Sequence, residues 1–537
     1  MKRLFTVLLL GALWMGAPLT VAAQEAGADT TADSTADTTV DSTADTTESA
    51  AADTTADTTP DSAQTREVEV SANLLEGDVQ NGERVRRLIG NVQLRQEETH
   101  LRAQRAIQFL ERREILFTGD VLVVERGDSL RADTVLYNSR DKTGRADGSV
   151  HLSDGDVVVR APSGLYFTRE KRARFTAGVT LVDSTAKLSS RAGQYWSDEK
   201  RAEFYGDVVL LEERTYLEAD SVTYLRETDI SQARGNVFIE RMGGEAETDS
   251  LTRTLLFGHR AYNEDSTEYS RIEGDPLLVR LRADSLGAES DTLLIRAGVL
   301  ESMRIDSAGR SVQRLVAVDS VRIWQPDLAS VADSVVYDRV EADGEGPVEF
   351  VYLFGGPVAW FQNNQVTGDT LRLRGRDGGV DSLFVDGSAF VARRDSALEK
   401  IHQLRGGRLA AAFERDSLRS LVIGPQAEAI NFRSDEEGAG AGAVRMSADR
   451  IAFRFRGDDL RRIEAVRGTE GTYYSQELIP PDLALEGFTW IPGRRPSKSG
   501  LLRGTEIPRP VPGLTSNRYT EPERIERLQE VPPHRTD

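Results

Sequence analysis

The chain has 537 residues, of which 39% are hydrophobic and 29% charged, with a net charge of −20 and no cysteine. The hydrophobic share suffices for a folded core. The lack of cysteine excludes disulfides, thiol catalysis and Cys-ligated zinc. The acidic balance predicts no nucleic-acid partner, because duplex binding needs a basic stripe.

Residues 1–23 have the pattern of an export signal. Lys2 and Arg3 precede an apolar run from Leu4 to Trp14, and three small residues stand before Gln24. This order is typical of a signal peptide, and the run is too short for a transmembrane helix. We therefore predict a periplasmic protein, with association with the outer membrane left open.

Residues 24–66 form a second, low-complexity segment. Tetrads such as Ala-Asp-Thr-Thr fill residues 28–63, and residues 24–63 contain ten acidic and no basic residues. Such a composition cannot bury apolar surface, which predicts a solvated, disordered tether. The tetrads lack the Gly turn and bidentate Glu of a calcium loop, so we expect no metal site.

The rest of the chain repeats one short pattern. A glycine followed by a short apolar strand recurs every 28–30 residues, and a second element of the form apolar-x-Ala recurs with the same period. The glycines are Gly90, Gly119, Gly148, Gly178, Gly206 and Gly235. A fixed period of this length indicates a stacked repeat architecture.

Each unit has the alternation of β-structure. Val92 and Leu94 alternate with Gln93, and the Gly-Asn or Gly-Asp pairs are typical of turns. We predict three strands of about six residues per unit. The spacing predicts a regular array at 67–300, an irregular second array at 301–475 and an extended Pro-rich tail at 476–537.

These motifs resemble a known family. The Gly-Asn/Asp-Val turn, followed by apolar-x-Ala-Asp-x-apolar-x-Tyr as in Leu130–Tyr137 and Leu217–Tyr224, resembles the OstA/LptA-like proteins of Gram-negative bacteria. The resemblance covers residues 67–475. It implies an all-β, repeat-built open β-jellyroll, in two stacked or linked arrays. It also implies a carrier that moves lipopolysaccharide from an inner-membrane exporter to an outer-membrane translocon.

A lipid carrier needs a continuous apolar trough, because each exposed methylene costs about 0.8 kcal/mol. Stacked repeats place apolar side chains in register along one interior. The candidates for lipid binding are Val92, Leu94, Ile107, Phe109, Val121, Val123, Val135, Tyr137, Leu165, Phe167, Val208, Leu210, Val222, Tyr224, Val237 and Ile239. The alternative, that these residues pack a closed core, stays open.

The ends of such an array present free strand edges. A strand near Val68–Leu75, or one near Ile451–Phe455, is a candidate for pairing with another jellyroll, which would allow end-to-end self-association. Loops that cap both ends are an equal alternative.

We expect no enzyme and no cofactor. The five histidines occupy unrelated positions in the repeat, and no serine elbow or phosphate loop occurs. Two other functional classes stay open beside the carrier. One is a structural or adhesive β-repeat protein of the cell envelope, and the other is a polysaccharide-acting β-solenoid enzyme that uses two carboxylates.

Overall fold

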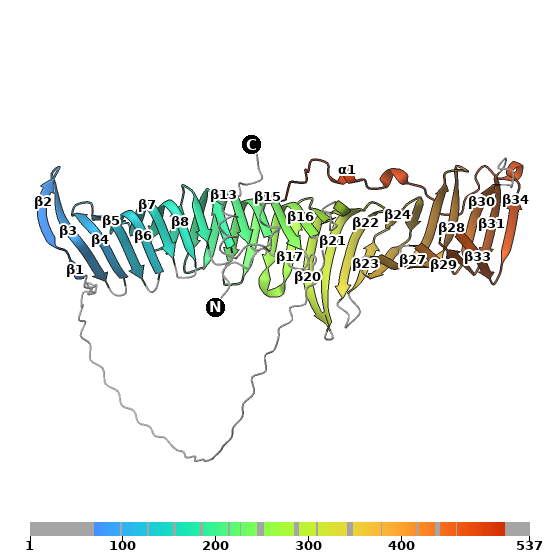
Figure 1. Ribbon diagram of the computed structural model, residues 1–537, viewed down its shortest axis with the longest axis horizontal. Helices are drawn as coiled ribbons and strands as arrows, with labels where there is room; N and C mark the ends of the chain where they lie inside the picture. The colour runs from blue at the N-terminus through green and yellow to red at the C-terminus, as the bar shows by residue number, and fades with distance from the viewer. Residues whose placement is uncertain are drawn as a thin grey trace, which may run out of the picture.

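The computed structural model describes residues 69–510 except 97–98, 126–127, 154–156, 183–185, 213–214, 226, 244–251, 284–288, 308–309, 341–346, 377–378, 415–416, 435–440 and 458. The predicted signal peptide and acidic tether lie outside these residues. What is described is an elongated antiparallel sheet of 34 strands (Figure 1), which confirms the all-β prediction.

The strands follow one another along the long axis (Figure 1). The first are β1 (Glu69–Ser71), β2 (Leu74–Gln80), β3 (Glu83–Gln96), β4 (Thr99–Phe109), β5 (Glu114–Glu125), β6 (Asp128–Asn138), β7 (Thr143–Ser153), β8 (Val158–Phe167), β9 (Arg172–Phe175), β10 (Val179–Val182), β11 (Ala186–Ser190) and β12 (Ala192–Trp196). The middle ones are β13 (Arg201–Glu212), β14 (Thr215–Leu225), β15 (Ile230–Gly243), β16 (Thr252–Glu264), β17 (Tyr269–Glu273), β18 (Leu277–Ala283), β19 (Glu289–Arg296), β20 (Val299–Ser307), β21 (Arg310–Trp324) and β22 (Leu328–Val340).

The last strands are β23 (Val348–Phe354), β24 (Val358–Phe361), β25 (Asn364–Thr367), β26 (Thr370–Arg376), β27 (Gly379–Asp395), β28 (Lys400–Glu414), β29 (Ser417–Gly424), β30 (Ala427–Ser434), β31 (Ala441–Ala448), β32 (Arg450–Arg456), β33 (Asp459–Val466) and β34 (Glu470–Tyr474). Three 3₁₀ turns and one short helix complete the described chain, η1 (Asp265–Thr267), η2 (Gln476–Leu478), η3 (Pro492–Arg494) and α1 (Lys498–Leu501). None of these helices is long and apolar enough to span a membrane. The ladder is unbroken at residue 300, where β20 pairs with both β17 and β21.

Each regular repeat consists of two long strands rather than the three short ones predicted. The Gly-Asn and Gly-Asp pairs lie inside strands: Gly90 (φ 78°) and Asn91 (φ 47°) are both left-handed in the middle of β3. They form a bulge, because these two residues oppose only one residue of β4 between the pairs Ile89–Arg105 and Val92–Ala103. The strand therefore bends and continues.

The Asp of the Ala-Asp motif contacts the same bend on the neighbouring strand. The Asp220 carboxylate on β14 lies against Gly235 of β15, so that a Cβ at this glycine would be 2.0 Å from Asp220 Oδ2. Asn236 Nδ2 donates to the same carboxylate at 3.1 Å. Asp133 occupies the equivalent place against Gly148. A side chain at these glycines would collide with the carboxylate, which explains why the two motifs recur together.

The bends divide the sheet into two arms that pack face to face. The valine arm carries the residues after each bulge, Val92, Val121, Val150, Val179 and Val208, which are all 1–3% exposed. The tyrosine arm carries Tyr137, Tyr166, Tyr195 and Tyr224. Core clusters contain residues of both arms, such as Val121 with Phe117 and Val208 with Tyr224. The inner faces of the arms thus enclose the hydrophobic interior.

The predicted extended tail is docked along the outer face of the valine arm (Figure 1), running back from β30 toward β16. Leu485 packs against Phe432 and Ile430, and Leu501 packs against Leu294 and Leu255. Side chains of the sheet bind its backbone, since Gln365 Nε2 donates to Thr489 O at 2.7 Å and Arg296 Nη1 donates to Leu501 O at 2.6 Å. Residues 476–510, which we call the strap, therefore tie distant repeats together.

Gly235→Ala tests the bend. Gly235 has a left-handed backbone, and a Cβ added there would collide with the Asp220 carboxylate. We therefore expect the free energy of unfolding to fall by about 1–3 kcal/mol. Thermal or urea denaturation measures this loss. The control is Gly77→Ala on β2, where a Cβ would meet nothing within 4 Å. Equal loss in both variants would show that the bend does not depend on this glycine.

Gln365→Ala tests the strap. Gln365 is buried, donates to Thr489 O and accepts from Ile491 N at 2.9 Å. Its removal leaves buried backbone groups unpaired, at about 1–3 kcal/mol each. We expect limited proteolysis within residues 476–510 to be faster than in the wild-type protein. Mass spectrometry of the fragments measures this rate. The control variant is Gln313→Ala on β21 in the tyrosine arm, which should be cleaved at the wild-type rate. Cleavage of Gln365→Ala at the wild-type rate would contradict the docking contact.

Candidate functional site

The inner face of the valine arm carries an unbroken aliphatic row. Starting from Val70 opposite Leu94, the cross-strand partner on each next strand of this arm is Leu, Val or Ile, from β1 to β21. The row is Val70, Leu94, Leu101, Val123, Leu130, Leu152, Val159, Leu181, Leu188, Leu210, Leu217, Ile239, Leu256, Leu278, Ile295 and Ile323. This row is a continuous apolar stripe across the stacked strands.

Exposure along the aliphatic row changes in the middle of the molecule. In β3–β8 most of its members, among them Leu94, Val123 and Leu130, are only half-buried. From Leu181 to Ile323 every member is at most 9% exposed. The same position in the repeat is thus partly exposed in β3–β8, a stretch of the inner face that we call the open trough, and belongs to a closed core in β10–β21.

The inner face of the tyrosine arm opposes this row with tyrosines spaced 29 residues apart. Tyr137, Tyr166, Tyr195 and Tyr224 alternate with small residues in register, since Tyr137 and Tyr166 both pair with Gly144, and Tyr195 pairs with Ala173 and Ala202. Tyr166 is 39% exposed, whereas Tyr224 is 4% exposed. The small residues leave room between the rings in the open part.

Tyr166 marks the mouth of the trough. Burial raises the pKa of its phenol, and the Glu125 carboxylate across the mouth raises this pKa further. The phenol therefore stays neutral, with an apolar ring and a polar tip, as suits a boundary between lipid and water.

The tyrosine row becomes polar where the interior closes. Ser231 pairs with Tyr224 and Asn263, and the row continues through Ser270 to Ser302. All four are at most 2% exposed, and Ser270 Oγ donates to Asn263 Oδ1 at 2.6 Å. Ser231 Oγ, Asn263 Nδ2 and Ser302 Oγ have no hydrogen-bond partner among the described residues. This polar belt and the closed aliphatic row separate the open trough from the C-terminal part.

Beyond the polar belt part of the inner face is again only half-buried, beside core residues such as Leu371 and Ile423. Val351, Leu373, Leu383 and Leu421 pack at the border of the main core cluster without being fully covered. The interior is thus sealed in the middle and less tightly closed on both sides, which corrects the expectation of one uninterrupted trough.

Register places the sequence-predicted interior residues in three groups. Leu94, Val123 and Tyr137 line the open trough. Val92, Val121 and Val135 lie at its bottom, at most 7% exposed, and the residues of the closed middle are Val208, Leu210, Val222, Tyr224, Val237 and Ile239, at most 4% exposed. These last six pack the core.

Four predicted residues lie on the opposite face. Ile107 opposes Leu116, whose ladder continues through Leu136 and Arg145 to Leu165, whereas the adjacent Ala106 opposes the core residue Phe117. Phe109 and Phe167 lie on this same outer face, where Arg112 and Arg172 stack on their rings at 4.0 and 4.1 Å. The interior assignment of Ile107, Phe109, Leu165 and Phe167 was therefore wrong.

The prediction also omitted residues that line the trough. These are Leu130, Leu152 and Val159 of the aliphatic row, with Ile115 and Tyr166 from the tyrosine arm. The signal was available, because Leu101, Leu130, Val159 and Leu188 recur at intervals of 29 residues beside the glycine motif.

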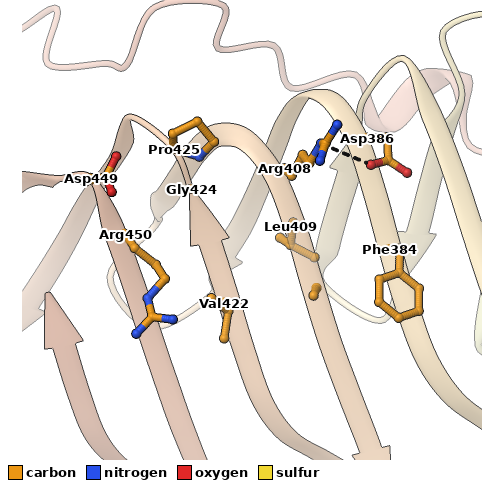
Figure 2. A pocket seen from close by; sticks show the side chains of 10 residues that line it. Phe384, Asp386, Arg408, Leu409, Val422, Gly424, Pro425, Asp449 and Arg450 are labelled. Carbon is orange, nitrogen blue, oxygen red and sulfur yellow. Dashed lines mark ion pairs between the residues drawn. The ribbon is translucent and has the colours of Figure 1, made fainter. Parts of the chain in front are cut away.

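Other possible sites lie outside the trough. A hollow of about 500 Å³ opens on the outer face of the second part (Figure 2), where Asp386 and Arg408 form an ion pair at 3.4 Å. Its lining residues Ala410 and Val422 alternate with the core residues Leu409 and Ile423, so these two side chains lie on the outer face. Within the described ranges, no group of three or more His, Asp or Glu side chains has the arrangement of a metal site.

The first part of the repeat array matches a known protein family. Residues 66–220 match a family described as OstA-like protein. This region is OstA-like. It contains β1–β13 and the open trough, and the family is one of lipid transport in the periplasm and cell envelope. No curated protein matches the chain.

Proposed function

We propose that the protein is a periplasmic carrier that binds lipopolysaccharide in the trough of β3–β8 and passes it toward the outer membrane for assembly. The observation that supports this most directly is the change along the aliphatic row. Leu94, Val123, Leu130, Leu152 and Val159 stay half-buried, although the same repeat positions are sealed further along. A lipid with several acyl chains would cover these side chains, with a gain of about 0.8 kcal/mol per buried methylene.

The ends of the array favour exchange with neighbouring proteins. Among the described strands, β1 and β2 each pair only with β3, and β2 is exposed along its whole length, with Leu75 65% and Val79 61% exposed. At the other end β33 and β34 each pair with one strand. Unpaired edges bind further strands. We propose that they pair with the exporter and translocon components of lipopolysaccharide transport, or end to end with a second copy.

The signal-like pattern of residues 1–23 supports the periplasmic part of this proposal, and no catalytic step is part of it. The structural or adhesive alternative predicts a sealed interior throughout. The polysaccharide-acting alternative predicts one pair of carboxylates in a cleft. The half-buried apolar trough favours the carrier over both.

Photo-crosslinking tests binding. A benzophenone amino acid at Leu130 lies in the trough, at Leu217 in the sealed core and at Phe109 on the outer face. We expect labelled lipopolysaccharide to crosslink at Leu130 at least several-fold more strongly than at Phe109 or Leu217. Equal labelling at Leu130 and Phe109 would argue against a lipid site in the trough.

Complementation tests transport. In a host depleted of the protein, we expect lipopolysaccharide to accumulate at the inner membrane, and wild-type protein to reverse this. Leu130→Asp should fail, because it places a carboxylate against acyl chains. Leu136→Asp, on the outer face of the same strand, should succeed. Both variants should keep the wild-type circular dichroism spectrum. Full rescue by Leu130→Asp would count against the proposed site.

A further inference from the structure

The outer face of the valine arm over β4–β8, β10 and β11 is basic in an otherwise acidic protein. Arg102, Arg131 and Arg160 occupy the outward position before each Ala of the repeat, and register places His151 and Leu122 between them. Lys187 follows on β11. Asp120 and Asp133 stand at the bend, where they contact Gln104 and Gly148, and beyond the bend no outward position of these strands in this arm is Asp or Glu. We call this surface the arginine face.

The arginines of this face are exposed and unpaired. Within the described part of the chain, no ion pair is formed by Arg102, Arg131 or Arg160. Exposed arginines elsewhere in the same repeats have partners, as in Arg84–Glu111 at 3.0 Å, Arg145–Asp147 at 2.8 Å and Arg191–Asp207 at 2.9 Å. Because alternate strands are about 9.6 Å apart, the face presents an evenly spaced row of free cations.

A hollow adjoins the far end of the row. It has a volume of about 610 Å³ and is lined by Arg160, His151, Thr180 and Ser189 among others. Such side chains are hydrogen-bond donors suited to carboxylates. The face and the hollow together fit an anionic chain rather than an apolar one.

The strap does not account for this face. The outward apolar residues that pack in one cluster with Leu501 begin at β13 with Val209 and Leu211. On β10 and β11 the outward positions nearest the bend are Thr180 and Ser189. The residues that follow the strap, 511–537, contain five acidic and four basic residues and are thus nearly neutral. They lack the charge that would complement an arginine row.

We infer that the acidic segment of residues 24–63 covers the arginine face of its own chain. It has ten carboxylates and no Lys or Arg, mostly four residues apart. The described chain begins at Glu69 in β1, which pairs with β3 at the edge of this same arm. Forty residues can reach over 100 Å, whereas β4 to β8 span about 20 Å.

Covalent attachment favours this occupant over a free anion, because a tethered segment has an effective concentration in the millimolar range. Single exposed ion pairs are weak and screened by salt, so the contact is multivalent and salt-sensitive. The segment thereby neutralises the face and excludes other anions, such as phosphate head groups of a membrane surface. The tetrads are then an internal cover and more than a spacer.

The absence of cysteine allows a direct measurement. In the chain from Gln24 onward, Thr46→Cys and Ser129→Cys carry a fluorescent donor and acceptor, the latter on the arginine face. We expect energy transfer to be high at 20 mM salt and to fall at least twofold at 500 mM. R102Q/R131Q/R160Q should lower it to the same extent at 20 mM. R84Q/R145Q/R191Q, which removes the same charge elsewhere, should leave it unchanged, as should truncation after residue 510.

Transfer that is insensitive to salt and to R102Q/R131Q/R160Q would overturn the inference, and so would an equal loss in both triple variants. Binding to vesicles of phosphatidylglycerol and phosphatidylcholine gives a second readout. Deletion of residues 28–63 should increase vesicle binding at least tenfold, and R102Q/R131Q/R160Q should abolish that increase. If the undeleted chain binds these vesicles as tightly as the deletion variant, the face is open to membranes and the segment does not cover it.

Discussion

The whole architecture depends on pairs of adjacent residues in the middle of its strands whose backbone is in the left-handed conformation. Each pair bends a strand without ending it, and the bends stack because alternate strands such as β3, β5 and β7 have such a pair at the same level. The valine after each bulge then lies at the bottom of the fold, and two sheet faces that would otherwise meet solvent turn toward each other. Without the bend there would be one flat, unstable sheet and no interior.

The interior is built from one repeated pattern but is used in two ways. Where the arms are apart, leucines and tyrosines at fixed repeat positions are left half-covered; where the arms close, the same positions become core and a polar row of Ser231, Asn263, Ser270 and Ser302 appears. Aliphatic character alone does not distinguish the two. Function in this fold thus depends on local arm separation as much as on residue type.

The sequence predicted the repeat, the β-class and the family, because period and alternation are local signals. It misplaced Ile107 and Phe109 for a physical reason: counting by two from Leu101 assumes an uninterrupted strand, whereas the bulge between Arg102 and Arg105 shifts the alternation by one and turns Ala106 inward instead. Leu165 and Phe167 follow the same rule after Ala161. The prediction of an extended tail left its docking open, although Val208–Leu211 is apolar on consecutive positions, which indicates a strand covered on both faces.

The strap changes how the array holds together. A stack of repeats normally contacts only its nearest neighbours, so it can fray and refold one unit at a time. Residues 476–510 instead tie β28 and β30 to β16 and β19 through Leu485, Pro508 and Leu501. Units many strands apart are thereby coupled, because opening of the strands near β28 and β30 is resisted by the contacts of the strap with β16 and β19. Because the strap follows β34 in the chain, this cooperativity is established only after all the strands that it ties together have been made.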